Sequence, residues 1–265
     1  MTVLEGVRLA HVRLRRRMLR VPVPDDFEAR FDGKRIVRIG RRAKYLLIEM
    51  EDGTVVIAHL GMSGRMKIHR EAAPPPGPHD HADFVTDTGI VVRFTDPRRF
   101  GLLLLDHVDT IEAHPLMRHL GPDPLSNAFN GAALAERLAG RASPLKAALL
   151  DQRTLAGLGN IYVCESLFRA GLSPRRLART VKNERAERLA ASIRDVLSEA
   201  IAAGGTTLRD HISPDGELGY FQHHFAVYSK EGEACPGCIC DRAAGGIRRI
   251  VQGGRSTFYC PTRQR

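Results

Sequence analysis

The stretch Cys235-Pro-Gly-Cys238, followed by Ile247-Arg-Arg-Ile-Val-Gln-Gly-Gly-Arg255-Ser-Thr-Phe-Tyr and then Cys260, decides how the end of this chain folds. Two close cysteines followed by a third beyond a hairpin-like segment are typical of a zinc ribbon. Gly253-Gly254 is a tight-turn signal, so we expect a hairpin with Arg255 beside its tip. A second Cys-x2-Cys pair would require cysteine at position 263, where the chain has Arg263. The tail therefore predicts a metal-stapled finger that lacks one expected ligand.

The charge balance indicates a polyanionic partner. The chain has 265 residues, with 40 Lys and Arg against 30 Asp and Glu, and a net charge of +10. This excess favours nucleic acid, although a generally basic proteome would produce the same value through solvated arginines. The sequence has no apolar run of about eighteen residues that would predict a membrane span. Arg8, Arg13 and Arg15 interrupt the apolar core that a signal peptide would need. Five cysteines, mostly near the C-terminus, favour a reducing compartment and metal binding over disulfides.

Residues 3–105 are predicted to be mostly strands. Short apolar or alternating runs occupy residues 36–39, 44–50, 54–60, 89–94 and 101–105. Asp52-Gly53 marks a hairpin turn, and a proline-rich loop interrupts the pattern at 74–78. A short helix is expected at 25–30. This half of the chain is therefore predicted to be a β-sandwich or barrel.

After a linker around residues 120–126, the hydrophobic period becomes helical. Asn130 is predicted to cap a helix through Leu138, and Ser143-Pro144 to begin the next one. A glycine-bent turn at 155–160 leads into a helix that Gly171 stops. Further starts are expected at Ser173-Pro174 and at Asn183, which caps a long helix ending at Gly204-Gly205. The predicted fold class is α+β: an N-terminal β-sandwich, a central helical domain and a C-terminal β-hairpin, zinc-finger-like tail.

Two loops of the first half carry residue types that suit duplex DNA. In Thr95-Asp-Pro-Arg98-Arg99-Phe100-Gly, Phe100 is able to wedge between bases and Arg98 to bond a base edge. The alternative is a solvated arginine beside a phenylalanine that returns to the core. Asp96-Pro97 indicates a tight turn, which fits both alternatives. Met62, in a Gly-Met-Ser-Gly loop, either fills a gap at an exposed tip or packs in the core. Lys44, within a strand pattern, either reaches a phosphate, donates a proton or is simply solvated.

Other polar motifs are individually weak. Asn160 either donates to a phosphate at a helix start or caps its own helix. The group His79-Asp-His81 is interpreted as structural or phosphate-facing, since a metal site would need a third distant ligand. Cys164 lies on an apolar helix face and is interpreted as a small buried side chain. Arg209 follows the Gly204-Gly205 pair in a loop and offers a cation there.

Together, these motifs resemble formamidopyrimidine-DNA glycosylases over essentially the whole chain. The shared segments, in the family's order, are Arg41-Arg-Ala-Lys-Tyr-Leu-Leu, His59-Leu-Gly-Met-Ser-Gly, Thr95-Asp-Pro-Arg-Arg-Phe-Gly, Leu120-Gly-Pro-Asp-Pro-Leu, Gly157-Leu-Gly-Asn-Ile-Tyr, Gly204-Gly-Thr-Thr-Leu-Arg-Asp and Gly253-Gly-Arg-Ser-Thr-Phe-Tyr-Cys. The resemblance implies a helix-two-turn-helix domain, with a β-sandwich at 1–113, a linker at 114–130, helices at 131–218 and a finger at 219–265. It also implies removal of oxidised purines, such as 8-oxoguanine and formamidopyrimidines, from double-stranded DNA and cleavage at the abasic site. Such chemistry requires the base to leave the stack.

The resemblance implies a role for each matching residue. Lys44 would act in β-elimination and Arg255 in δ-elimination. Met62, Arg98 and Phe100 would fill the space of the flipped base, and Arg209 would lie in the loop that closes over it. The phosphate contacts would be His79, Arg141, Lys146 and Asn160. Zinc would be bound by Cys235, Cys238 and Cys260. The protein is expected to be a monomer in the bacterial cytoplasm, associated with the nucleoid and not with a membrane.

The chain departs from the family's pattern at both ends. The family's mature chain begins Pro-Glu-Leu-Pro-Glu and uses the proline amine as nucleophile, whereas this sequence begins Met1-Thr2-Val3. We expect either a true start upstream of the printed one or a non-catalytic binder of damaged or abasic DNA. A relative of RNA-binding helix-two-turn-helix proteins is a third reading. In the tail, Cys240 is the candidate fourth sulfur. Otherwise zinc would bind weakly with a water ligand, or the hairpin would fold without metal.

Overall fold

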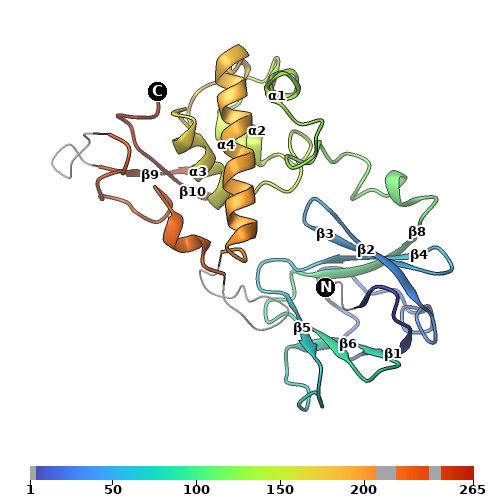
Figure 1. Ribbon diagram of the computed structural model, residues 1–265. Helices are drawn as coiled ribbons and strands as arrows, with labels where there is room; N and C mark the ends of the chain where they lie inside the picture. The colour runs from blue at the N-terminus through green and yellow to red at the C-terminus, as the bar shows by residue number, and fades with distance from the viewer. Residues whose placement is uncertain (1–3, 207–218, 239–245) are drawn as a thin grey trace. The chain divides into compact units, whose positions relative to one another are not determined.

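The computed structural model describes residues 4–206, 219–238 and 246–265 (Figure 1). These residues form two compact units: one runs up to Arg118, and the other spans His119–Gly205 and continues over Tyr220–Arg265. The first unit is built of strands and the second of helices and a β-hairpin, which confirms the predicted α+β class. The expected sites at Arg209 and Cys240 lie outside the described residues.

The first unit contains two antiparallel four-stranded sheets, in the orders β1-β6-β7-β5 and β2-β3-β4-β8. Their strands are β1 (Leu9–Leu14), β2 (Ile36–Arg42), β3 (Tyr45–Met50), β4 (Thr54–His59), β5 (Arg65–His69), β6 (Asp80–Thr86), β7 (Val91–Thr95) and β8 (Leu102–His107). One apolar cluster joins the inner faces, with Ile48 and Val56 from one sheet and Phe84 and Val92 from the other. Two separate sheets around one core make a sandwich, which decides between the two predicted alternatives.

The prediction of a helix at 25–30 is wrong, because this segment is a run of turns. Phe27 and Phe31 are both fully buried and pack edge to face, with ring centroids 4.9 Å apart. Their backbone N–H groups donate to Pro24 and Glu28, three residues back, as in tight turns. Burial of two large rings in the sandwich core therefore sets this segment's path.

The second unit contains four α-helices and one hairpin within its described residues. They are α1 (Gly131–Leu138), α2 (Leu145–Leu150), α3 (Asn160–Arg169), α4 (Asn183–Ala202), β9 (Arg248–Gln252) and β10 (Arg255–Tyr259); short 3-10 turns occupy Ile111–Ala113 in the first unit and Ala178–Thr180 and Phe221–His224 in the second. The hairpin packs on α3, where Cys164 and Phe168 share an apolar cluster with Phe258 and Cys260. None of the helices among the described residues is long and apolar enough to span a membrane.

The predicted helix starts are partly correct. Asn130 caps α1 by accepting a bond from the Ala133 N–H at 2.9 Å, as predicted. The start at Ser143 is wrong by one residue, since Pro144 is the N-cap of α2. No helix begins at Ser173-Pro174; turns precede the 3-10 turn at Ala178–Thr180. Lys182, not Asn183, is the N-cap of α4.

Two hydrogen bonds between the start of α2 and the segment after Ser173 explain the errors at Ser143 and at Ser173-Pro174. The first N–H groups of α2, at Leu145 and Lys146, donate to the carbonyls of Arg176 and Pro174. The segment after Ser173 therefore satisfies the start of another helix and does not begin its own. A sequence pattern that considers only neighbouring residues does not reveal this long-range capping.

Candidate nucleic-acid site

The first unit places two of the predicted DNA-contacting loops side by side. The loop 60–64 leaves β4 for β5, and the loop 96–101 leaves β7 for β8. Strands β4 and β8 are paired at His59 and Leu102, and strands β5 and β7 at Arg65 and Thr95. Both loops thus cross between the sheets at the same end of the sandwich.

Glycines allow the two loops to touch through their backbones. A Cβ at Gly61 would lie 2.6 Å from the Phe100 carbonyl carbon, closer than any side chain is tolerated. Gly61 also has a φ of +66°, in the left-handed region. A Cβ at Gly101 would lie 2.8 Å from the His59 carbonyl oxygen. The close approach therefore depends on glycine at both positions.

Asp96 bonds the two loops to each other. It is fully buried, and its carboxylate accepts bonds from Ser63 Oγ at 2.7 Å and from the Gly101 N–H at 2.8 Å. Ser63 Oγ in turn accepts from the Arg98 N–H at 3.2 Å. A buried carboxylate needs such donors to offset its lost hydration. Asp96 is thus an organising residue of the site, whereas its sequence indicated only a turn.

The loops present two large apolar side chains to solvent. Met62 is 69% exposed and Phe100 is 44% exposed. The guanidinium carbon of Arg98 lies 4.7 Å from the centroid of the Phe100 ring. The alternative of a core methionine and a core phenylalanine is therefore wrong. An adjacent Met, Phe and Arg on a rigid loop pair provide an apolar wedge with a hydrogen-bonding head.

Lys44 is exposed and lies in the turn between β2 and β3, not within a strand as its pattern suggested. Its neighbour Tyr45 pairs with His59, and their ring centroids are 5.1 Å apart. Burial lowers the pKa of His59, and the charges of Arg20 and Lys44 lower it further. His59 Nδ1 accepts from the Gly61 N–H at 2.8 Å, which requires that nitrogen to be unprotonated. Lys44 thus lies beside the start of the 60–64 loop.

The group around His79 makes structural contacts through a backbone carbonyl, an imidazole ring and a carboxylate, which is one of the two roles expected of it. His79 is exposed, and its carbonyl accepts from the Asp96 N–H at 2.9 Å. The His81 ring nitrogen Nε2 is hydrogen-bonded to the Asp96 carbonyl at 2.8 Å. The Asp83 carboxylate forms an ion pair with Arg93, in which Arg93 Nε lies 2.8 Å from Asp83 Oδ1. Within the described ranges, this group is not among the candidate metal clusters.

In the second unit, two predicted phosphate-contacting residues converge on the hairpin. Lys146 Nζ donates to Thr257 Oγ1 at 2.6 Å and to the Ser256 carbonyl at 3.2 Å. Asn160 Nδ2 donates to the same Ser256 carbonyl at 3.0 Å and to the Tyr228 hydroxyl at 3.3 Å. Asn160 does not cap α3, whose N-cap is Gly159. No local sequence pattern connects these residues with β10.

Lys146 is fully buried, so its ammonium faces the hairpin and not the solvent. Both of its hydrogen bonds go to β10, and the phosphate contact expected of Lys146 stays a prediction. Burial lowers the pKa of Lys146, and the charge of Arg255 lowers it further. The neighbouring Cys164 is also buried, and burial raises the pKa of its thiol, so it remains a protonated apolar side chain as predicted.

Arg255 is exposed and opens β10 directly after the turn at Gly253 and Gly254, whose φ values are +56° and +72°. This matches the hairpin and the tip position predicted from the sequence. The next residue, Ser256, provides the carbonyl held by Lys146 and Asn160. Arg255 therefore directly precedes Ser256, the strand residue that side chains of α2 and α3 hold in place.

Arg141 follows α1 and is tied to the helical unit. Its guanidinium lies 3.1 Å from Asp151, and it also donates to the Arg137 carbonyl at 3.0 Å. The side chain is 35% exposed, so a further anion has access to it. Arg141 thus remains a candidate phosphate contact.

Glu165 is a buried residue that no motif indicated. It is 1% exposed and accepts bonds from three successive N–H groups, at Ala226, Val227 and Tyr228. Its carboxylate fixes the segment that carries Tyr228, the hydroxyl partner of Asn160. The only sequence signal was a single acid among the apolar residues of α3.

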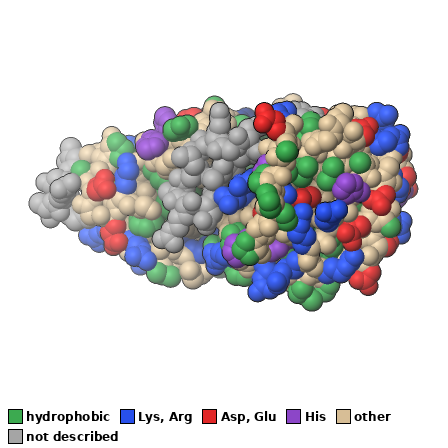
Figure 2. Space-filling model, turned by 90° about the horizontal axis from the view of Figure 1, so that it is seen from below, with side chains coloured by type: hydrophobic (Ala, Val, Ile, Leu, Met, Phe, Trp, Pro, Cys, Tyr) green, Lys and Arg blue, Asp and Glu red, His purple; other side chains and the backbone are tan. Residues whose placement is uncertain are grey.

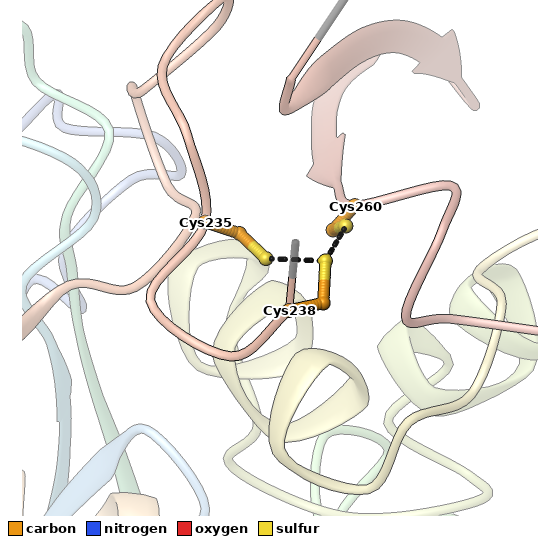
Figure 3. A group of neighbouring side chains, drawn as sticks. All are labelled: Cys235, Cys238 and Cys260. Carbon is orange, nitrogen blue, oxygen red and sulfur yellow. Dashed lines mark hydrogen bonds between the residues drawn. The ribbon is translucent and has the colours of Figure 1, made fainter. Parts of the chain in front are cut away.

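The three predicted metal ligands come together. The sulfur atoms of Cys235, Cys238 and Cys260 lie within 4.8 Å of one another and point inward (Figure 3). Tetrahedral zinc with Zn–S bonds of about 2.3 Å separates its sulfurs by about 3.8 Å. The described cysteines therefore suit a metal ion.

Positive charge does not form a single patch on the face of the β-sandwich unit that Figure 2 shows. On the face drawn in Figure 2, its Lys and Arg side chains are interspersed with Asp and Glu. Several arginines of this unit are paired with acids, such as Arg38 with Glu49 and Arg17 with Glu28. Individual cations, and not the net charge alone, therefore indicate where phosphates would bind.

The models of two domains of one protein family match the chain. Residues 1–103 match the formamidopyrimidine-DNA glycosylase N-terminal domain, and residues 120–211 match the formamidopyrimidine-DNA glycosylase H2TH domain. The chain is 58% identical to a formamidopyrimidine-DNA glycosylase of Rhodospirillum centenum, covering 93% of this chain and 89% of the relative. It is 57% identical to that of Rhodospirillum rubrum, covering 99% and 94%.

Solved structures agree with these matches. The MutM (Fpg) protein of Thermus thermophilus is 42% identical with a TM-score of 0.85, over 99% of this chain and 93% of that one. Lactococcus lactis Fpg in complex with DNA containing an abasic site is 30% identical with a TM-score of 0.87, over 98% and 93%. The relatives are named as glycosylases, which gives no support to the reading as a non-catalytic binder. The chain belongs to the formamidopyrimidine-DNA glycosylase family of DNA glycosylases.

Proposed function

We propose that this protein removes oxidised purines from double-stranded bacterial DNA and then cleaves the strand at the abasic site. The observation that carries the proposal is the pair of loops at 60–64 and 96–101, locked together by Asp96 and presenting Met62, Arg98 and Phe100. The family's DNA complexes, which include a Lactococcus lactis Fpg bound to DNA containing Fapy-dG, support the same substrate class. Chromosomal DNA as substrate would place the protein at the nucleoid.

The exposed loop pair suits the first requirement, which is to take a base out of the stack. Met62 and Phe100 would occupy the space that the flipped nucleotide leaves, since apolar wedges offset the loss of base stacking. Arg98 would bond the edge of the base left without a partner. The rigid backing by Asp96 matters because a wedge on a mobile loop would pay an ordering cost on binding.

Lys44 and Arg255 are proposed to act in strand cleavage. Lys44 lies in an exposed turn beside His59, and an amine there would be able to reach bound DNA and transfer the proton in β-elimination. Arg255, at the hairpin tip, would assist δ-elimination by stabilising the leaving phosphate. Asn160 and Lys146 would support this step by holding Ser256, while His79 and Arg141 would contact phosphates.

The finger is proposed to bind one zinc ion through Cys235, Cys238 and Cys260. Its thiolate set suits zinc, which when bound supplies structural cross-linking and no chemistry at the lesion. The fourth ligand proposed from the sequence is Cys240. The Arg209 loop is proposed to cover the flipped base.

A strand-cleavage assay tests the proposed function. Three duplexes of one sequence are compared, carrying 8-oxoguanine opposite cytosine, an abasic site, or no lesion. The protein, expressed with its natural N-terminus, is expected to release the base and cut the first duplex, to cut the second, and to leave the third intact. Binding of all three duplexes without base release or cleavage would refute the proposal.

Arg98→Ala distinguishes wedge function from general phosphate contact. The variant is expected to lose about tenfold or more in cleavage of the 8-oxoguanine duplex, since one good base contact is worth ~1–3 kcal/mol. The abasic duplex needs less base extrusion and is expected to be cut with a smaller loss. Arg38→Ala, whose side chain is 66% exposed and paired with Glu49, serves as the control for lost positive charge.

A further inference from the structure

Arg263 occupies the place where a second Cys-x2-Cys pair would have its last cysteine. It directly contacts the Cys235–Cys238 segment, called the knuckle below. Its Nη1 donates to the Gly237 carbonyl at 2.8 Å, between Cys235 and Cys238. Its own N–H donates to the Cys260 sulfur at 3.4 Å. Arg263 therefore touches both segments that carry the described cysteines.

The other side of Arg263 rests on the end of α3. Its Nε donates to the Phe168 carbonyl at 3.3 Å, and its guanidinium carbon lies 5.0 Å from the Phe168 ring centroid. Phe168 belongs to the last turn of α3, where its carbonyl also accepts from the Gly171 N–H at 3.1 Å and where the helix dipole favours a cation. Stacking of the planar guanidinium on the ring adds to this attraction.

The fit at Gly237 is close. A Cβ on Gly237 would lie 2.5 Å from Arg263 Nη1, so the knuckle backbone presses against the guanidinium. The adjacent Gln264 secures the same tail: its Oε1 accepts from the Cys260 N–H at 2.8 Å and its Nε2 donates to the Leu172 carbonyl at 3.0 Å. The tail is thus anchored on α3 by contacts that involve no metal.

We propose that Arg263 is a positioning residue that holds the Cys235–Cys238 knuckle against α3 independently of a metal ion. With the guanidinium in place, the sulfurs of Cys235, Cys238 and Cys260 stay assembled when the metal leaves. Arg263 does not ligate the metal, because a guanidinium offers donors and no lone pair at neutral pH. The inference concerns the finger alone and is independent of the reaction that the protein performs.

The test measures the thiol reactivity of metal-free protein. Zinc is removed by a chelator under reducing conditions, and alkylation of Cys235, Cys238 and Cys260 is followed separately by mass spectrometry. Arg263→Gln is expected to raise these alkylation rates about tenfold, since losing charge-assisted bonds increases the open population. Arg265→Gln is the matched control, because Arg265 also lies in the tail and its side chain donates, among the described residues, only to the Thr262 carbonyl at 3.2 Å.

The same rates are then measured with zinc bound. Zinc itself holds the sulfurs, so the Arg263→Gln protein is expected to differ from wild type by less than about twofold. Arg263→Lys keeps the charge but loses the planar fork, and is expected to give an intermediate rate in the metal-free state. This milder variant decides the question if Arg263→Gln does not fold. Rates for the Arg263 variants equal to those of wild type and Arg265→Gln, or an equal effect with and without zinc, would overturn the proposal.

Discussion

Lys146 Nζ lies 2.6 Å from Thr257 Oγ1, so a fully buried ammonium on α2 is bonded to the middle of β10. The same ammonium reaches the Ser256 carbonyl, next to Arg255. A residue that resembles a phosphate contact therefore acts within the described chain as a support for the hairpin. Loss of this support is therefore expected to affect the hairpin that carries Arg255.

Lys146→Met is expected to destabilise the helical unit by roughly 1–3 kcal/mol, because Thr257 and the Ser256 carbonyl lose a buried partner. Thr257→Val removes the other end of one of these bonds. In urea unfolding, the double variant is expected to lose less than the sum of the two single changes. Lys182→Met, at an exposed lysine, is the control and is expected to change stability by less than about 0.5 kcal/mol. Additive losses would show that the bond contributes no coupling.

Gly61→Ala is expected to reduce cleavage of an 8-oxoguanine duplex by about tenfold or more, because its Cβ would force the 60–64 and 96–101 loops apart and misplace the wedge. Gly89→Ala is the matched control. Gly89 also has a positive φ, +85°, but a Cβ there would meet nothing within 4 Å. Backbone strain is expected to cost both variants about 1 kcal/mol of stability. Only Gly61→Ala is expected to lose cleavage activity as well. Equal losses would mean that the loop contact is unimportant.

Arg255→Ala is expected to change the product of strand cleavage more than the release of the base. Gel analysis of an abasic duplex should show the β-elimination product accumulating, with δ-elimination reduced about tenfold or more. Arg249→Ala removes an exposed arginine from the paired strand, where its Nε donates to Ser256 Oγ at 3.1 Å. That control is expected to retain the wild-type product ratio. An unchanged ratio in Arg255→Ala would contradict the proposed role.

Asp83 provides an acid-sensitive contribution to the sandwich. Burial alone would raise the pKa of this carboxyl, but hydrogen bonds from Arg93 and Arg15 lower it from 3.8 to about 2. A lowered folded-state pKa stabilises the fold above the unfolded value, and this stability is lost as the pH falls from about 4 to about 2. The shift corresponds to roughly 2 kcal/mol. In Asp83→Asn, the free energy of unfolding should no longer fall by this amount between about pH 4 and about pH 2. The control Asp109→Asn, at an exposed carboxyl, should retain this dependence.

The sequence predicted the architecture well because much of it is local. Alternating apolar residues indicated strands around Ile48 and Val56, and the Asn130 cap and the hairpin turn at Gly253 and Gly254 rest on residues near each other in the chain. Resemblance then identified exposed candidates such as Met62, Phe100 and Arg255, which the structure places on loops and at the hairpin tip.

The remaining features depend on contacts between distant residues. Lys146 and Thr257 are 111 positions apart, and nothing near Lys146 indicates that its ammonium is buried. Asp96 suggested only a turn until Ser63 and Gly101 were seen to donate to it. The false helix start at Ser173 has the same origin, since Pro174 and Arg176 accept bonds from α2. Such pairings follow from tertiary packing and have no local pattern.

Borohydride trapping on an 8-oxoguanine duplex tests the central claim, that this protein is a glycosylase that also cleaves the strand, most directly. A bifunctional glycosylase attacks the sugar with an amine, and borohydride reduces the resulting imine to a stable covalent adduct. The protein with its natural N-terminus is expected to form an adduct with the lesion duplex and none with the undamaged one. Tight binding of the lesion duplex with no adduct and no released base would contradict the account.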